Sequence, residues 1–203
     1  MIRKAVLSDI PAVARIYEKI HTAEETGEVT IGWIRGIYPT EDTARQALTR
    51  GDLFVQEDGG NIGGAAIINQ CQVDSYYGAS WRYPAEDSQV MVLHTLVIDP
   101  EAGRKGYGKA FVRFYEDYAR QRNCPYLRMD TNARNARARA MYKALGFSEV
   151  DIVPCQFNGI PGVQLGLLEK ALKLKNNCVF SRFALTNREL FVILPPEEGV
   201  VGA

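Results

Sequence analysis

A glycine-rich segment with a lysine, GRKGYGKA at residues 103–110, has the composition of a phosphate-binding loop. Glycines let backbone N–H groups approach an anion closely, and the dipole of a following helix adds to the attraction. Gly103, Gly108 and Lys109 match the pattern G-x-x-x-x-G-K of nucleotide hydrolases. That chemistry needs a Ser or Thr after the lysine to bind Mg²⁺, but Ala110 stands there. The segment predicts an anion site and disfavours a nucleotide hydrolase; a glycine turn without a ligand stays an alternative.

A second group of polar residues follows in DTNARNARARAMYKALGF, residues 130–147. A helical pattern covers residues 134–145 and ends at Gly146, which suits the left-handed position after a helix. Asn135 and Tyr142 are seven residues apart, which is nearly two turns, so they share one helix face about 10 Å apart. This spacing allows one long, thin ligand to touch both side chains; the alternative for Tyr142 is an aromatic side chain at the edge of the core.

His94, one of only two histidines, lies within VMVLHTLVI at residues 90–98. A nearly continuous apolar run indicates a strand that is buried on both faces. On a period of two, His94 shares a face with Val92, Leu96 and Ile98. The imidazole is therefore either a hydrogen-bonded core group or a proton acceptor that faces a cleft.

The rest of the pattern supplies the elements that must position these residues. IRKAV indicates a strand, the next helix has Pro11 in its first turn, and Thr40 precedes a second short helix. Two apolar runs joined around Asp58-Gly59 indicate a hairpin. A helix after the glycine loop and the strands YLRMD, FSEVDIV and VQLGLLEKAL complete the order β-α-α-β-β-β-α-β-α-β-β. This order predicts an α/β fold in which helices cover both faces of a mixed sheet.

Composition limits the classes of partner. The 203 residues contain 24 Lys and Arg and 24 Asp and Glu, so the formal net charge is zero, which disfavours nonspecific nucleic-acid binding. No apolar run reaches the roughly 18 residues of a membrane span, and MIRKAVLSDI lacks the apolar centre of a targeting peptide. The four cysteines form no C-x-x-C pair. We expect free thiols in a reducing cytoplasm, with no metal, nucleic-acid or membrane partner.

Together, LHTLVIDPEAGRKGYGKAF and DTNARNARARAMYKALGF closely resemble the GNAT superfamily of N-acetyltransferases, and the resemblance extends over roughly residues 1–172. In that family the loop follows a strand that ends in V-x-P, and it reads R/Q-x-x-G-x-G. Ile98, Pro100, Gly106 and Gly108 match this pattern. The resemblance implies a mostly antiparallel mixed sheet flanked by helices, with a cofactor cleft between two splayed central strands.

The resemblance also implies acetyl-CoA as co-substrate, with its pyrophosphate bound by the loop. The implied loop residues are Gly103, Arg104, Lys105, Gly106, Tyr107, Gly108 and Lys109. Gly103 departs from the family, which usually has Arg or Gln there, and Arg104 follows one place later. Pyrophosphate binding should survive, because backbone N–H groups do most of that work. Four arginines, Arg128, Arg134, Arg137 and Arg139, indicate a solvated surface, with one of them available to the 3′-phosphate of the cofactor.

Further roles carry over residue by residue from the family. The backbone of Leu96, Val97 and Ile98 is implied to run alongside the pantetheine arm of the cofactor. Asn135 is implied to contact the cofactor. Tyr142 is implied to lie near the sulfur, where a phenol can protonate the leaving thiolate.

The implied activity is N-acetylation of a primary amine on a small molecule or peptide; a non-catalytic CoA or metabolite sensor is the alternative. HTLVI resembles the same strand in arylalkylamine acetyltransferases, which makes His94 a candidate proton acceptor, with water as the other. His21 is expected on the surface. Aromatic residues in two irregular segments should shape the acceptor pocket, and nearby glutamates could attract a cationic amine. They are Trp33, Tyr38, Tyr76, Tyr77, Trp81 and Tyr83, with Glu24, Glu25 and Glu28.

The chain is predicted to form one acetyltransferase domain over residues 1–175, followed by an extension at 176–203. CVFSRFAL and ELFVILPP in that extension look like two more short strands. Unpaired apolar strands invite association, so we expect them to pack on the sheet edge or on a second copy of the chain.

Overall fold

The computed structural model describes residues 1–102 and 105–173, so the predicted extension at 176–203 and the loop residues Gly103 and Arg104 lie outside the described residues. The elements run β1 (Ile2–Lys4), α1 (Ile10–Glu25), α2 (Glu41–Arg50), β2 (Leu53–Asp58), β3 (Asn61–Asn69), β4 (Val90–Ile98), α3 (Tyr107–Gln121), β5 (Tyr126–Asn132), α4 (Ala136–Ala144), β6 (Ser148–Phe157) and β7 (Ile160–Ala171). The predicted order of strands and helices is confirmed.

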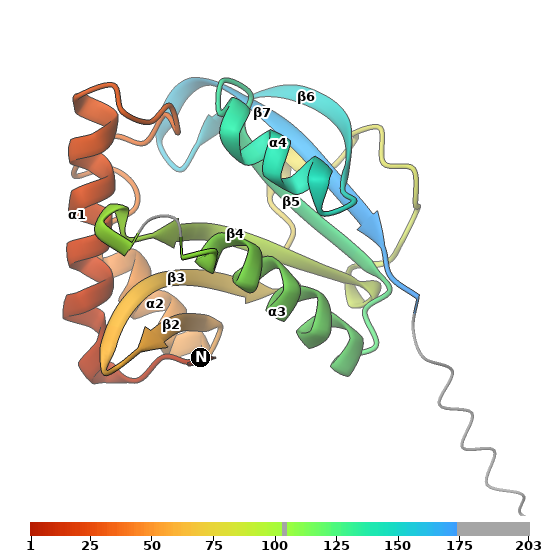
Figure 1. The fold of residues 1–203 in the computed structure, drawn as a ribbon. Helices are drawn as coiled ribbons and strands as arrows, with labels where there is room; N and C mark the ends of the chain where they lie inside the picture. The colour runs from red at the N-terminus through yellow and green to blue at the C-terminus, as the bar shows by residue number, and fades with distance from the viewer. Residues whose placement is uncertain (103–104, 174–203) are drawn as a thin grey trace, which may run out of the picture.

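The seven strands form one sheet in the order β1-β2-β3-β4-β5-β7-β6 (Figure 1). Every neighbouring pair is antiparallel except β4 and β5, which are parallel. The α/β class and the mostly antiparallel mixed sheet are therefore confirmed. The parallel pair requires a crossover, which α3 supplies between the two strands.

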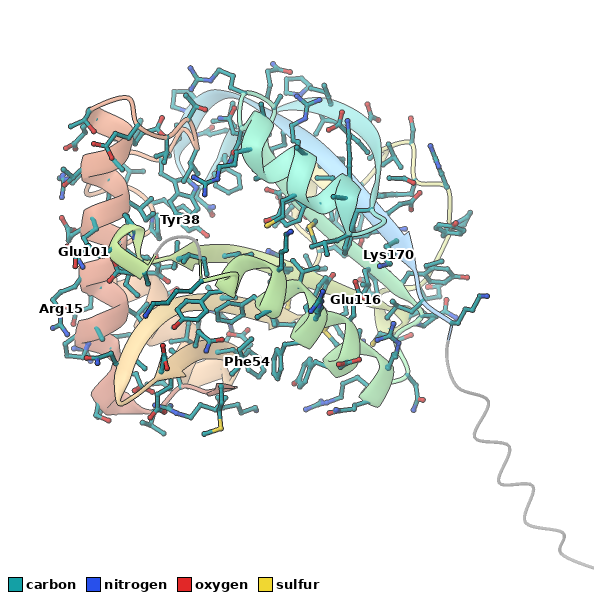
Figure 2. The ribbon with its side chains drawn as sticks, in the orientation of Figure 1. Arg15, Tyr38, Phe54, Glu101, Glu116 and Lys170 are labelled. Atoms are coloured by element: carbon teal, nitrogen blue, oxygen red, sulfur yellow. The ribbon has the colours of Figure 1, made fainter. Side chains whose placement is uncertain are left out.

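Helices cover both faces of the sheet, as the pattern predicted (Figure 1). One hydrophobic cluster joins α1 and α2 to β2, β3 and β4, and a second joins α3 and α4 to the opposite face. On the α3 side, the ring of Phe54 lies 5.1 Å from that of Tyr118, and Lys170 of β7 donates to Glu116 of α3 over 2.8 Å (Figure 2). Each face of the sheet therefore carries a compartment covered by helices.

Local signals explain where several elements begin and end. The Thr40 hydroxyl accepts a hydrogen bond from the Thr43 N–H and so caps α2. Gly59 and Gly60 occupy the β2–β3 turn with φ of 57° and 81°, and Gly146 ends α4 with φ of 86°. His21 contradicts its prediction: it is 1% exposed, because α1 extends to Glu25 and carries it under the following loop, where Nε2 is 2.9 Å from the Pro39 carbonyl oxygen.

Candidate active site

The central feature of the sheet is a split between β4 and β5. Their paired positions run from Val90 opposite Tyr126 to Leu93 opposite Met129, and no later pair forms. Both strands continue, β4 to Ile98 and β5 to Asn132, and they diverge beyond the last pair (Figure 1). The residues immediately past that pair therefore border an opening in the sheet.

A β-bulge in β4 lies at the same place. Ile67 of β3 pairs with His94, whereas Ala65 pairs with Val97, so β4 has one extra residue between these pairs. Thr95 has a φ of 48°, in the left-handed region that a residue other than glycine rarely adopts. The bulge leaves the backbone of this segment without a regular partner on β3.

The bulge overturns part of the predicted face of His94, namely that it shares a face with Leu96 and Ile98. Leu93, Leu96 and Ile98 pack toward α3, whereas Val97 belongs to the cluster under α1 and α2. The inserted residue shifts the alternation by one, so His94 lies opposite to Leu96 and Ile98 instead of beside them. The alternation of side chains along a strand predicts the shared face correctly only for an uninterrupted strand, and β4 is interrupted by the bulge.

His94 and Asp130 are the first residues past the last pair of β4 and β5. Both line one cavity of about 690 Å³ on the α1–α2 side of the sheet, together with Tyr38 and Thr95. Tyr142 belongs to the cluster on the α3–α4 side. The split thus brings together two candidate acid–base groups from one compartment and a phenol from the other.

Asp130 was not singled out from the sequence, yet it is the most perturbed acid of this cavity. Burial raises the pKa of Asp130 to about 6, although a hydrogen bond from the Tyr76 hydroxyl, at 2.8 Å, acts in the opposite direction. A carboxylate with this pKa is ionised at neutral pH and is a better proton acceptor than an ordinary aspartate. The available signal was a lone carboxylate at the end of the apolar strand YLRMD.

Hydrogen bonds around His94 determine its tautomer. Asn69 Nδ2 donates to the Asp52 carboxylate over 2.8 Å, so the oxygen Oδ1 of Asn69 must face the imidazole. Nε2 of His94 lies 3.1 Å from that oxygen and 3.1 Å from the Cys71 carbonyl oxygen, both acceptors. The proton is therefore on Nε2, and Nδ1 carries the lone pair. Burial lowers the pKa of His94 to about 4, so the ring is neutral at neutral pH.

Tyr142 is 7% exposed, and its ring centroid lies 6.2 Å from that of Phe147. Burial raises the pKa of Tyr142, and the nearby charge of Asp130 raises it further, so the phenol stays protonated. Asn135 is the N-cap of α4, seven residues before Tyr142. Its side-chain oxygen accepts a hydrogen bond from the Ala138 N–H over 3.1 Å.

The glycine loop leads into the N-terminus of α3. Gly106 is the N-cap with a φ of 78°, and the N–H groups of Tyr107, Gly108 and Lys109 in the first turn have no acceptor within the helix. N–H groups of a helix end that face the same way form an anion site. Lys105 has its ammonium 3.4 Å from the Asp58 carboxylate of the β2–β3 turn, to which the Tyr107 hydroxyl also donates.

Gly108 lies where a side chain would crowd its neighbours. A Cβ at Gly108 would lie 3.3 Å from the Met141 sulfur of α4 and 3.9 Å from Ile98 of β4. The absence of a side chain lets the start of α3 approach both neighbours. Leu96 and Ile98 line the same side of the sheet, so the α3–α4 side offers a path from the helix N-terminus to the split.

The loop between β3 and β4 forms one wall of the cavity, and Arg128 secures it. Arg128 is 5% exposed, contrary to the expected solvated surface, because it stands on β5 beneath this loop. Its guanidinium donates to Gln72 and to the Tyr83 carbonyl oxygen over 2.5 and 2.9 Å and lies 4.3 Å from the Trp81 ring centroid. Of the other arginines, Arg139 pairs with Glu149 over 2.6 Å.

The aromatic and acidic residues expected at the acceptor pocket divide into two groups. Tyr38 lines the cavity, with its hydroxyl bonded to Thr95, and Tyr76 contacts Asp130. Glu24 and Glu25 are instead used locally: Glu24 accepts from the Ile31 N–H over 2.6 Å, and Glu25 pairs with Arg35 over 2.8 Å.

Within residues 1–102 and 105–173, no group of three or more His, Cys, Asp or Glu side chains is placed to hold a metal ion. In the part of the chain that the structure describes, no helix has both the length and the apolar character that crossing a membrane requires.

Among curated proteins, the chain is similar to [Ribosomal protein bS18]-alanine N-acetyltransferase of Escherichia coli K12, with 35% identity over 60 residues, 30% of this chain and 40% of that protein. It is also similar to Aminoglycoside N(6')-acetyltransferase type 1 of Klebsiella aerogenes, with 36% identity over 103 residues, 51% of this chain and 62% of that protein. The chain thus spans less than two thirds of the length of each of these relatives.

Solved structures share the fold. The E. coli ribosomal-protein-S18-alanine N-acetyltransferase matches with a TM-score of 0.60 and 19% identity over 89% of this chain and 98% of that one. A Salmonella typhimurium protein solved with its cofactor acetyl-CoA matches with a TM-score of 0.61 and 18% identity over 85% of this chain and 94% of that one. The family model described as Acetyltransferase (GNAT) family matches residues 13–147. The chain therefore belongs to the GNAT family of N-acetyltransferases.

Proposed function

We propose that this enzyme transfers the acetyl group of acetyl-CoA to a primary amine of a small molecule or peptide. The observation that carries the proposal is the split between β4 and β5. On one side it opens to the cavity with Asp130 and His94, and on the other side it opens to Tyr142. An amine and a thioester can therefore approach each other from opposite faces of the sheet.

Acetyl-CoA fits the α3–α4 side. The pyrophosphate would bind the backbone N–H groups at the start of α3, within the loop of residues 103–109. The pantetheine arm would run along the backbone of Leu96, Val97 and Ile98 toward the split, and Asn135 would contact it from the start of α4. The left-handed Gly106 and the closely packed Gly108 support this placement, because both keep the approach to the helix end free of side chains.

Each step of the transfer has a candidate group. The neutral amine attacks the carbonyl carbon of the thioester, and Asp130 takes the proton that the nitrogen loses as the new bond forms, with His94 through Nδ1 as the alternative acceptor. Backbone N–H groups at the Thr95 bulge stabilise the negative charge that develops on the carbonyl oxygen. The bond from carbon to sulfur breaks, and Tyr142 gives its proton to the departing thiolate. Holding both reactants at the split supplies a further part of the rate.

Turnover tests the proposal directly. We expect free CoA thiol to accumulate when the enzyme is given acetyl-CoA and a panel of amines, and mass spectrometry should show a product about 42 mass units heavier than one of the amines. A non-catalytic sensor would give binding heat with CoA but no thiol with any amine. A nucleotide hydrolase would bind Mg-ATP instead of CoA, and Ala110 at the Mg²⁺ position argues against it.

Gly106→Val should weaken CoA binding about tenfold. A Cβ at Gly106 would meet no atom within 4 Å, so the substitution causes no clash. Its cost comes from the φ of 78°, because the left-handed conformation costs a β-branched residue about 1–2 kcal/mol. Relief of that strain would rotate the N–H groups away from the pyrophosphate. Calorimetric titration with CoA measures the change.

Gly27→Val is the matched control for this experiment. Gly27 has a φ of 77° and equally open surroundings, but it lies in the loop after α1. Both variants should lose similar thermal stability, and only Gly106→Val should lose affinity for CoA. Equal CoA affinity in the two variants would show that the loop does not bind the cofactor.

A further inference from the structure

The charges that line the acceptor cavity are arranged in a simple way. Among the described residues that line it, Arg50 and Asp130 are the charged side chains, and the others are apolar, hydroxyl or amide groups. His94 is neutral because burial lowers its pKa to about 4. The cavity therefore presents one cation and one anion to whatever binds there.

Arg50 is a cation whose side chain is 48% exposed and is held by an ion pair with Asp52. It is the last residue of α2, four residues after Gln46 and seven after Thr43, so the three residues share the face of that helix that lines the cavity. Asp52 holds the guanidinium by one edge, with 2.9 Å from Nε to Oδ2 and 3.3 Å from Nη2 to Oδ1. Asp52 is itself 7% exposed and bound by Asn69 over 2.8 Å.

This anchoring leaves Arg50 able to bind a second anion. A guanidinium has five N–H donors in one plane, and the edge facing Asp52 uses only part of them. The Nη1 group has no hydrogen-bond partner among the described residues. Because Asp52 already orients the side chain, little side-chain entropy remains to be lost when a planar carboxylate binds the free edge.

Tyr38 lines the same cavity, and its hydroxyl is bonded to Thr95 at the bulge. Burial is the main reason that the pKa of Tyr38 is raised to about 12. Asp130 lies at the split, where the acetyl group must be presented, and Arg50 lies on the α2 side of the cavity.

Resting on the proposed function, we propose that the acceptor is a small amine that also carries a carboxylate, with its amine at Asp130 and its carboxylate at the free edge of Arg50. A polycationic acceptor such as an aminoglycoside fits this cavity poorly, because a single carboxylate faces it and the guanidinium repels additional amines. The volume of about 690 Å³ suits a molecule of amino-acid size.

The test uses the wild-type enzyme and a panel of α- and ω-amino acids. For the best of them, kcat/KM is compared with the values for its amide and its decarboxylated amine, each corrected to the concentration of unprotonated amine. We expect the carboxylate form to be preferred about tenfold or more, the factor that 1.4 kcal/mol gives.

Arg50→Gln should remove that preference through KM for the carboxylate substrate, and should leave the amide and the decarboxylated amine unchanged. Arg50→Lys should restore part of the preference, because it keeps the charge but not the planar edge. Arg45→Gln is the matched control, since Arg45 is an exposed arginine of the same helix that pairs with Glu41 over 2.5 Å. It should leave all three substrates unaffected.

The inference is overturned if amines are acetylated but the amide or the decarboxylated amine serves as well as the carboxylate. It is also overturned if Arg50→Gln lowers kcat/KM equally for all three. If the acceptor is a peptide, the amide should be the preferred substrate, because its uncharged amide group resembles the peptide bond that follows an N-terminal residue. If CoA binds but no amine is acetylated, the proposed function is wrong as well. This result is distinguishable from the outcomes above, because in those outcomes amines are acetylated.

Discussion

Tyr142→Phe is expected to lower kcat about 100-fold while CoA affinity and thermal stability stay nearly unchanged. The substitution removes one hydroxyl and keeps the ring that packs on Phe147. Assistance by a general acid is typically worth about 100- to 10,000-fold, and a thiolate is a fair leaving group, so we expect the low end. Because burial raises the pKa of Tyr142, the phenol remains available as a donor throughout the working pH range.

The measurement is single-turnover acetyl transfer to the best amine, which separates chemistry from product release. Tyr118→Phe provides the matched control, since Tyr118 packs on Phe54 and Phe114 toward the end of α3 and is remote from the split. A rate for Tyr142→Phe within about twofold of wild type, with chemistry rate-limiting, would reduce Tyr142 to a wall of the pocket.

Asp130→Asn is expected to lower kcat/KM about 100- to 10,000-fold, the range typical of a lost general base. The sign of the pH dependence follows from the raised pKa. A proton acceptor works only when ionised, so wild-type activity should fall as pH drops through about 6, the pKa of Asp130. The amide that replaces the carboxylate can still form a hydrogen bond with the Tyr76 hydroxyl, so the fold should survive. In this variant the fall in activity near pH 6, the acidic limb of the pH profile, should disappear.

His94→Gln separates the two candidate acceptors. If Asp130 takes the proton, this variant should lose less than about tenfold and keep the limb near pH 6. If His94 takes the proton, the limb should lie near pH 4, where its lowered pKa is, and should vanish in His94→Gln. Protonation of the amine substrate also lowers activity at acidic pH. The pH at which this happens changes with the pKa of the amine, whereas a fall in activity caused by an enzyme group stays at the same pH. Asp117→Asn, at an exposed site of α3, is the charge-matched control.

Several features could be predicted from the sequence because local chemistry determines them. Thr40 caps a helix, Gly146 takes the left-handed position after another, and paired glycines turn a hairpin, each through bonds or sterics within a few residues. The order of apolar runs indicated the order of strands and helices, and with it the fold class. The glycine loop before a helix indicated the anion site in the same way.

The candidate acid–base groups, by contrast, depend on contacts between segments far apart in the chain. The bulge at Thr95 appears only in the pairing of β3 with β4, and it moves His94 to the face opposite Leu96. Asp130 becomes a site residue because β5 parts from β4 one position before it, and its raised pKa comes from burial that no local pattern encodes.

Arg128 and Arg50 illustrate the same division. In the sequence each is one arginine among many, and exposure is the ordinary expectation. The folded chain buries Arg128 beneath the β3–β4 loop, whereas Arg50 stays exposed but lines the cavity with Asp52 as its support. The elements and the glycine loop could be predicted because they follow from local spacing, and the family could be predicted because two stretches of the chain resemble it. Which side chains face the split could not, because facing, burial and charge depend on strands and helices brought together from distant parts of the chain.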